Sequence, residues 1–137
     1  MSNSPTVLLI DAHKEERDYY CDRLTKYTDF RVLYTDTGQN GLLICQRLPI
    51  VDCVVLELDL PDMSAFEVLL KLVPRVEHPD IPIVVLTGVA NVFLLEAARR
   101  NGAHSALYKP MTSGDLLQHT IRKAMAAVPV DRKRLYS

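Results

Sequence analysis

The chain alternates short apolar runs with segments of helical spacing, and it does so five times along its length. The apolar runs are four to six residues long and most contain β-branched residues, as expected of buried strands. They occupy residues 6–10, 30–35, 53–56, 81–86 and 105–108. Helical spacing follows at residues 15–27, 37–48, 65–73 and 92–100, and again after Thr112 or Ser113. This alternation predicts an α/β fold in which a five-stranded parallel sheet lies between helices.

The length and charge of the chain exclude several classes of protein. A chain of 137 residues forms one domain, and a net charge of -1 lacks the basic excess of a nucleic-acid-binding domain. No apolar run approaches the ~20 residues that cross a bilayer, and residues 1–5 lack the charged start of a secretory signal. We therefore predict a cytoplasmic domain over residues 1–128 that binds neither nucleic acid nor membrane. A polar, basic tail or linker is predicted over residues 129–137.

Polar side chains stand where four of the predicted strands end. They are an acid after the first strand, two acids after the third, a hydroxyl after the fourth and a lysine after the fifth: Asp11, Glu57, Asp59, Thr87 and Lys109. In an open parallel α/β sheet, ligands and chemistry gather outside the carboxyl ends of the strands. The sequence therefore predicts a functional site at this edge of the sheet.

Acid, acid, hydroxyl and lysine in this order resemble the receiver domain of two-component response regulators. The stretch from Leu60 to Glu67 and the pair Gly102-Ala103 match the same family, and the resemblance covers residues 6 to 128. It implies a flavodoxin-like, doubly wound sheet with strand order 2-1-3-4-5. It also implies a non-enzymatic regulatory module in phosphorelay signal transduction. The implied partners are a histidine kinase, a phosphotransfer protein or an output domain.

The resemblance gives each strand-end residue a role. The acceptor position at the end of the third strand takes a phosphoryl group from a phosphohistidine, and here it holds Glu57. Thr87 and Lys109 match the hydroxyl and the amine that bind phosphoryl oxygens. Asp11, Glu57 and Asp59 would supply the carboxylates of a weak Mg²⁺ site, because Mg²⁺ prefers oxygen ligands.

The chain also departs from the family pattern. Besides Glu57 in place of the acceptor aspartate, Ala12 replaces the more direct metal ligand, and Ala106 stands at the aromatic switch position, with Tyr108 two residues later. Glutamate is longer than aspartate by one C–C bond, about 1.5 Å, and phosphoryl transfer depends on positioning. We therefore expect weak or absent Mg²⁺ binding and impaired or absent phosphorylation. We also expect the Glu57 carboxylate to pair with Lys109.

The sequence alone also allows other functions for these residues. A working phosphoacceptor receiver that uses Glu57 or Asp59 is the alternative function. Asp11 could instead cap the following turn, and a nucleotide- or flavin-binding domain would need a glycine-rich phosphate loop that residues 11–15 do not offer. His13 has no second histidine at ligand spacing and is expected to be a solvated loop residue.

The segment 89–95 is unusually apolar, with six apolar residues of seven. A helix that is apolar beyond one face either meets a partner or is buried more than usual. The preferred interpretation is an interface with a second copy of the chain or with an output domain, made by Phe93 and Leu94 with Tyr108 nearby. Extra burial within the domain is the alternative.

Overall fold

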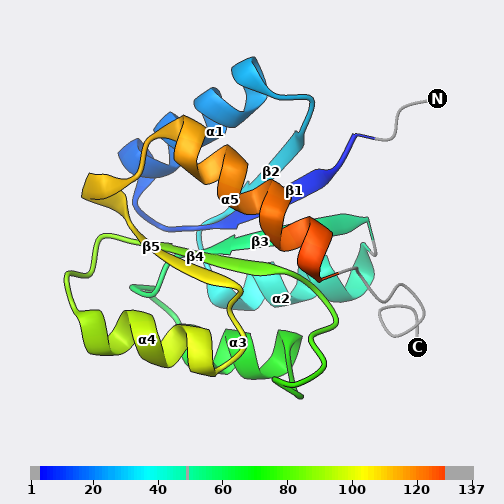
Figure 1. Ribbon diagram of the computed structural model, residues 1–137, viewed down its shortest axis with the longest axis vertical. Helices are drawn as coiled ribbons and strands as arrows, with labels where there is room; N and C mark the ends of the chain where they lie inside the picture. The colour runs from blue at the N-terminus through cyan, green and yellow to red at the C-terminus, as the bar shows by residue number, and fades with distance from the viewer. Residues whose placement is uncertain (1–3, 49, 129–137) are drawn as a thin grey trace.

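The strands of the computed structural model form one parallel sheet in the order β2-β1-β3-β4-β5 (Figure 1). The structure describes residues 4–48 and 50–128, so the predicted tail lies outside the described residues. The strands are β1 (Thr6–Ile10), β2 (Arg31–Thr35), β3 (Val51–Leu56), β4 (Ile83–Thr87) and β5 (Ser105–Tyr108). The doubly wound, flavodoxin-like topology predicted from the sequence is therefore confirmed.

Helices cover both faces of the sheet. They are α1 (Lys14–Tyr27), α2 (Gly38–Arg47), α3 (Ala65–Leu72), α4 (Val92–Arg100) and α5 (Gly114–Ala127), with a short 3-10 helix η1 (Lys109–Met111) after β5. In Figure 1, α1 and α5 lie on one side of the sheet and α2, α3 and α4 on the other. None of the helices in the described part of the chain is long and apolar enough to span a membrane.

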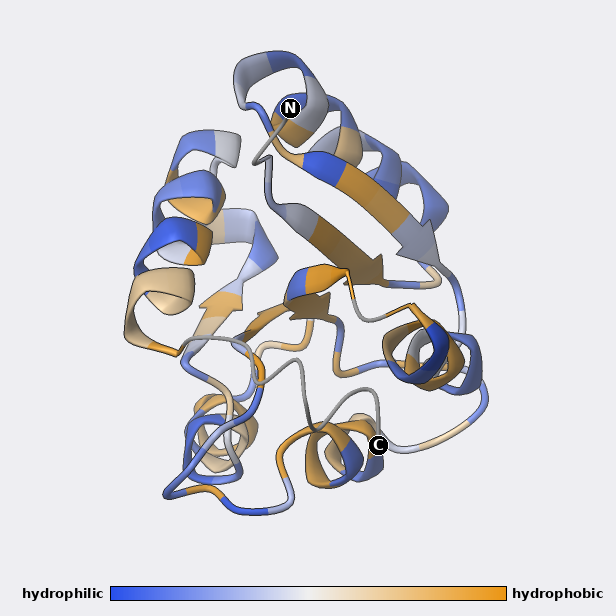
Figure 2. Ribbon diagram, turned by 90° about the vertical axis from the view of Figure 1, so that its right-hand side faces the viewer, coloured by the Kyte–Doolittle hydropathy of each residue, from blue (hydrophilic) through white to orange (hydrophobic). Residues whose placement is uncertain are grey.

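Alternate residues of the same strand pack into two separate hydrophobic cores, one on each face of the sheet. Leu8 and Ile10 of β1 pack on the side of α2 and α3, whereas Val7 and Leu9 pack on the side of α1 and α5. This is the period of two that a strand imposes on its side chains. Figure 2 shows the apolar strands lying between helices that carry blue, hydrophilic outer faces. Because both faces of the sheet are buried, the central strands read as continuous apolar runs.

Two glycines stand where the structure requires a residue without a side chain. A side chain at Gly41 of α2 would collide with Ile10 of β1, so glycine lets this helix approach the sheet closely. Gly102 has a φ of +114° and follows Asn101, the C-cap residue of α4, so the helix ends at a backbone conformation that glycine adopts without strain.

Some predicted boundaries were wrong by a few residues. β3 begins at Val51 rather than at residue 53, and the Asp52 carboxylate accepts a hydrogen bond of 2.8 Å from the backbone N–H of Thr6. β4 begins at Ile83 rather than at residue 81, and Pro82, which lacks an N–H, precedes it. The strand ends that position the site were placed correctly within one residue.

Candidate functional site

The register of the strands brings the predicted site residues to one edge of the sheet. Ile10 and Leu56 are partners across β1 and β3, so Asp11 and Glu57 follow at neighbouring positions. Thr87 is the last residue of β4 and pairs in register with Tyr108 of β5. Lys109 comes next and opens η1. The four residues that lead the predicted site are buried together: Asp11, Glu57, Thr87 and Lys109.

The Lys109 ammonium is enclosed by three carboxylates. Its Nζ lies 2.7 Å from Asp11 Oδ2, 2.9 Å from Glu57 Oε1 and 3.0 Å from Glu16 Oε1. An ammonium has three N–H donors, so each of them has a carboxylate partner. Burial disfavours the charged lysine, but the hydrogen bonds to Asp11 and Glu57 outweigh it and raise the pKa of Lys109. The ion pair between Glu57 and Lys109 that the sequence predicts is therefore present. Glu16 was not predicted from the sequence.

The backbone beside Lys109 is held by a residue of α1. The Tyr20 hydroxyl lies 2.7 Å from the carbonyl oxygen of Thr112 and 3.2 Å from that of Lys109. Tyr20 is only 4% exposed, so this contact ties η1 to the core on the α1 side. The position of the ammonium is thus fixed from both ends of the lysine.

The Glu57 carboxylate accepts four hydrogen bonds. Oε1 accepts from Lys109 and from the backbone N–H of Gly88 at 3.1 Å, while Oε2 accepts from the Thr87 hydroxyl and from the backbone N–H of Asp59 at 3.1 Å. Burial alone would favour the neutral acid, but the bonds from Thr87, Lys109 and Asp59 lower the pKa of the Glu57 carboxyl. Glu57 is therefore an ionised, fully hydrogen-bonded group with a side chain only 1% exposed.

His13 is a loop residue whose side chain is 40% exposed, as the sequence predicts, but it also contacts the pocket. Its Nδ1 is 3.0 Å from Asp11 Oδ1, and its Nε2 is 3.2 Å from Asp59 Oδ2. Burial lowers the pKa of His13, but the Asp11 carboxylate more than offsets this and raises it overall. Asp11 also accepts from the backbone N–H of His13 at 2.8 Å, so it caps the turn and pairs with Lys109 at the same time.

A metal ion would find a mixed donor set in this pocket. Among the described residues, Asp11, His13 and Glu57 each offer a ligand atom within 4.8 Å of the other two. The sequence predicts Asp59 as a third carboxylate ligand. Its carboxylate is 67% exposed, however, and is not one of this group. Receiver domains bind Mg²⁺ at an acidic pocket, and these two buried carboxylates fit such an ion. The third donor is a nitrogen, and Lys109 already contacts both carboxylates.

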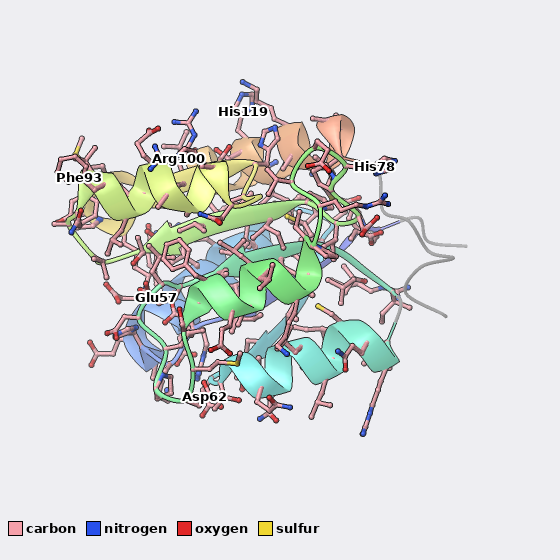
Figure 3. All side chains as sticks on the ribbon, turned by 90° about the horizontal axis from the view of Figure 1, so that it is seen from below. Glu57, Asp62, His78, Phe93, Arg100 and His119 are labelled. Atoms are coloured by element: carbon pink, nitrogen blue, oxygen red, sulfur yellow. The ribbon has the colours of Figure 1, made fainter. Side chains whose placement is uncertain are left out.

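The loop after β3 is anchored by a carboxylate that was not predicted as a functional residue from the sequence. Asp62 accepts hydrogen bonds of 2.9 Å from the backbone N–H groups of Gly38 and Gln39 at the start of α2. A carboxylate is favourable here, because the first N–H groups of a helix lack partners within the helix and the positive end of the helix dipole attracts a negative charge. Figure 3 shows Asp62 and Glu57 at the same end of the molecule.

The apolar side chains at the start of α4 face outward. Phe93 is 81% exposed, Val92 63% and Leu94 37%, so the alternative of extra burial within the domain was wrong. Figure 3 shows Phe93 projecting from the end of α4 at the site end of the molecule. Tyr108 is half-buried one residue before Lys109. An exposed apolar face beside the pocket is therefore a feature of this structure.

A doubly wound parallel sheet with a carboxylate pocket and a buried lysine at its carboxyl edge defines a receiver-like α/β protein. The chain belongs to the family of response regulator receiver domains, whose model matches residues 7–121. It is 34% identical over 90 residues to the regulatory protein LuxO of Vibrio vulnificus and 33% identical over 94 residues to the cell cycle response regulator CtrA of Brucella ovis. These matches cover 65% and 69% of this chain but only 19% and 39% of the relatives.

A third relative carries a different name. The chain is 30% identical over 109 residues to a probable cyclic di-GMP phosphodiesterase of Vibrio cholerae, and the match covers 78% of this chain and 24% of that protein. The chain thus spans well under half the length of each of these three relatives.

Solved structures confirm the fold. The signal receiver domain of a putative LuxO repressor from Vibrio parahaemolyticus superposes with a TM-score of 0.78 at 22% identity, covering 90% of this chain and 92% of that one. The receiver domain of a sensor histidine kinase from Pseudomonas aeruginosa, which holds a magnesium ion in its active-site cleft, gives 0.77 at 18% identity and covers 90% and 98%. At these identities the likeness concerns the fold alone.

Proposed function

We propose that this chain is an atypical receiver domain that regulates partners through its surface, with its pocket held by a built-in ion pair instead of an aspartyl phosphate. The observation that carries this proposal is the set of four hydrogen bonds to the Glu57 carboxylate. In the family, the hydroxyl and the lysine at these positions bind phosphoryl oxygens. Here both already bind the glutamate at the acceptor position.

Phosphoryl transfer to Glu57 would have to overcome this arrangement. A carboxylate has about four lone-pair positions, and four donors engage them here. An attack on phosphorus would first break at least one of those bonds in a buried site. The extra methylene of glutamate moves the nucleophile outward, and a misplacement of about 1 Å can cost on the order of 100-fold in rate. Impaired or absent phosphorylation follows from both effects.

Metal binding in the proposed state is weak for Mg²⁺. Asp11 and Glu57 are the carboxylates that would hold the ion, which in the family neutralises phosphoryl charge. Both carboxylates contact the Lys109 ammonium, and Ala12 offers no ligand atom. Lysine therefore supplies part of the positive charge that the metal would otherwise bring.

The partners follow from the family. Receiver domains work with a histidine kinase or phosphotransfer protein and with an output domain, and the two regulators matched here are much longer than this chain. We assign the chain a regulatory, non-enzymatic role, with the apolar face of Phe93 and Leu94 as its contact surface for an output domain or a second copy.

Incubation with acetyl phosphate and Mg²⁺, followed by intact-mass analysis and phosphate-affinity electrophoresis, tests the proposal. The expected result is no mass gain of a phosphoryl group, under conditions that label a receiver domain with aspartate at the acceptor position. Robust labelling that maps to Glu57 would overturn the proposal and favour a phosphorylatable receiver. Labelling that maps to Asp59 would move the acceptor by two positions and overturn it equally.

A further inference from the structure

The strand β2 forms one edge of the sheet, because no other strand in the described part of the chain lies beyond it (Figure 1). On its inner side, the backbone N–H of Arg31 donates to the carbonyl oxygen of Pro5 at 2.8 Å. In a parallel pair only every second residue of a strand bonds to a given neighbour, so the N–H and C=O groups of Val32 and Tyr34 point away from β1. Tyr34 is 57% exposed, so this edge is open to solvent. Such a row of backbone groups is a template for a further strand.

A cavity of about 370 Å³ lies beside this edge, between the end of β2 and α2. Its apolar walls come from Leu43 and Ile44 of α2 and from Leu48, the C-cap residue of that helix. Leu48 is 45% exposed, so the cavity opens to solvent. Successive side chains of a strand point to opposite faces. Every second side chain of a strand added along β2 would therefore lie on the α2 side, where the cavity can take a large apolar group.

The charges beside the edge favour an acidic partner. Arg47 lines the cavity, and no acidic residue of the described part of the chain lines it. Arg31 is exposed at the start of β2. On the α1 side, the guanidinium carbon of Arg17 lies 4.4 Å from the centre of the Tyr34 ring. Asp36 is an exposed acid that follows the strand, so three arginines stand against one carboxylate along β2.

The Arg17 guanidinium has donors left for such a partner. One of its amines donates to the carbonyl oxygen of Asp11 at 3.2 Å, and its buried Nε has no hydrogen-bond partner among the described residues. The Asp18 carboxylate lies 3.8 Å from Nε, and its other oxygen bonds to Lys14 at 2.6 Å. A guanidinium carries five N–H donors, so a carboxylate that arrives over Tyr34 would gain a charge-assisted hydrogen bond.

We infer that the β2 edge binds an extended peptide segment of a partner protein, in which acidic residues adjoin a large apolar residue. The segment adds a strand to the sheet by hydrogen bonds to the backbone of Val32 and Tyr34. Its apolar side chain enters the cavity, and its acidic side chains face Arg17 and Arg47. A second copy of the chain is less suitable, because a two-fold contact would bring the same arginines together.

This surface is distinct from the α4 face. The two edge strands of the sheet are β2 and β5, and α4 lies next to β5. Peptide binding at β2 therefore goes beyond the proposed function, and it does not depend on whether Glu57 accepts a phosphoryl group.

Selection of a phage-displayed library of random octapeptides against the whole chain tests this inference. We expect the enriched peptides to carry a large apolar residue with Asp or Glu at adjacent positions. One enriched peptide, labelled with a fluorophore, is then titrated with the natural chain and with three variants. Their binding is compared by fluorescence anisotropy: Tyr34→Pro, Arg47→Glu and the control Arg100→Glu.

Each variant has its own expected effect. Proline at position 34 removes an N–H that faces the free edge, which edge strands tolerate, and should weaken binding by about tenfold or more. Arg47→Glu replaces an opposite charge by a like one and should weaken binding by roughly fivefold, with a smaller loss at high salt. Arg100 also lies in the last turn of a helix and is exposed on α4 (Figure 3), so Arg100→Glu should leave the affinity unchanged.

A second measurement uses the natural chain alone, so that it holds even if Tyr34→Pro fails to fold. Hydrogen exchange followed by NMR should slow at the amides of Val32 and Tyr34 when the peptide is added, and change less at Leu33, whose N–H faces β1. Absence of enriched peptides, enriched peptides without acidic residues, or protection confined to other strands would each overturn the inference. Equal losses in Arg47→Glu and Arg100→Glu, or undiminished binding by folded Tyr34→Pro, would do the same. Self-association of the natural chain that Tyr34→Pro abolishes would assign the edge to a second copy instead.

Discussion

The Glu57 carboxylate and the Lys109 ammonium face each other at 2.9 Å, with side chains only 1% and 3% exposed. They come from the ends of β3 and β5, and β4 lies between these strands in the sheet. Thr87, at the end of β4, donates to the same carboxylate. The pair therefore ties together three strands at the edge where the family places its phosphoryl group.

Replacing Glu57 by Gln should destabilise the protein while keeping its shape. The change removes the charge that faces Lys109, although Asp11 and Glu16 still contact the ammonium. We expect the free energy of unfolding to fall by about 1–3 kcal/mol, below the loss typical of a buried ion left without any partner. Urea unfolding followed by circular dichroism measures it. Glu67→Gln, at an exposed position of α3, is the control and should shift stability by less than ~0.5 kcal/mol. Equal stability of Glu57→Gln and the natural chain would contradict a stabilising pair.

The stabilisation from this pair should depend on pH at both extremes. The folded-state pKa of Glu57 is below its ordinary value of 4.5, so its contribution is present above that pH and is lost as pH falls through the folded pKa. The pKa of Lys109 is above its ordinary value of 10.5, so its contribution is present below that pH and is lost as pH rises through the folded pKa. Unfolding of the natural chain and Glu57→Gln across pH should show a constant difference near neutrality and a smaller one in acid. A difference that grows in acid would show the opposite sign of linkage.

The fold could be predicted because the local sequence of each strand and helix indicates its type. The apolar runs are continuous where both faces of the sheet are covered, and Asn91 and Gly102 mark the two ends of α4. The predicted helix 92–100 and strand 105–108 agree with α4 and β5. The predicted first residues of β3 and β4 were wrong. Asp52 and Pro82 lie at these strand starts, and neither residue type is favoured in strands.

The strand-end residues of the site could also be predicted, because parallel strands bring their carboxyl ends to one edge. Glu16 and His13 could not. Glu16 reaches Lys109 from the first turn of α1, across 93 positions of the chain. His13 turns back onto Asp11 because the backbone between them forms a turn that Asp11 itself caps. Such contacts depend on how a loop and a helix pack, and periodicity carries no signal for them.

Binding of Mg²⁺ should be weak, in the millimolar range or above at physiological salt. The two buried carboxylates already contact the Lys109 ammonium, and a second cation must be brought near that charge. Amide shifts followed during a Mg²⁺ titration measure the affinity. Tight, sub-millimolar binding would contradict this expectation, and shifts centred on Asp59 would then make it a ligand.

The exposed face of α4 should contact another chain. Leu94→Glu places a charge beside Phe93, which is 81% exposed, and should shift the assembly seen by light scattering or abolish capture of a partner. The cost to folding should be small because Leu94 is 37% exposed. Leu70→Glu is the matched control, since Leu70 is an apolar residue of α3 that is 63% exposed. If the two variants behave alike, the α4 face has no special role in association.

Phosphorylation should return only when both departures in the pocket are reversed. Glu57→Asp shortens the side chain and frees the Thr87 hydroxyl and the Lys109 ammonium for phosphoryl oxygens, but Ala12 still offers no metal ligand. Ala12→Asp restores a carboxylate beside Asp11 but leaves Glu57 with its four hydrogen bonds. We therefore expect acetyl-phosphate labelling with Mg²⁺ in the double variant and none in either single variant.

Intact-mass analysis at matched times measures the labelled fraction of each variant, and thermal unfolding checks that all three are folded. Labelling of Glu57→Asp alone would show that the longer acidic arm was the whole obstacle, and that Asp11 suffices as the second carboxylate for the metal. Absence of labelling in a folded double variant would mean that Glu16, His13 or the enclosed lysine also blocks the transfer. Lys109 has a carboxylate partner for each of its three N–H groups, so Glu16→Gln added to the double variant is then the informative next change.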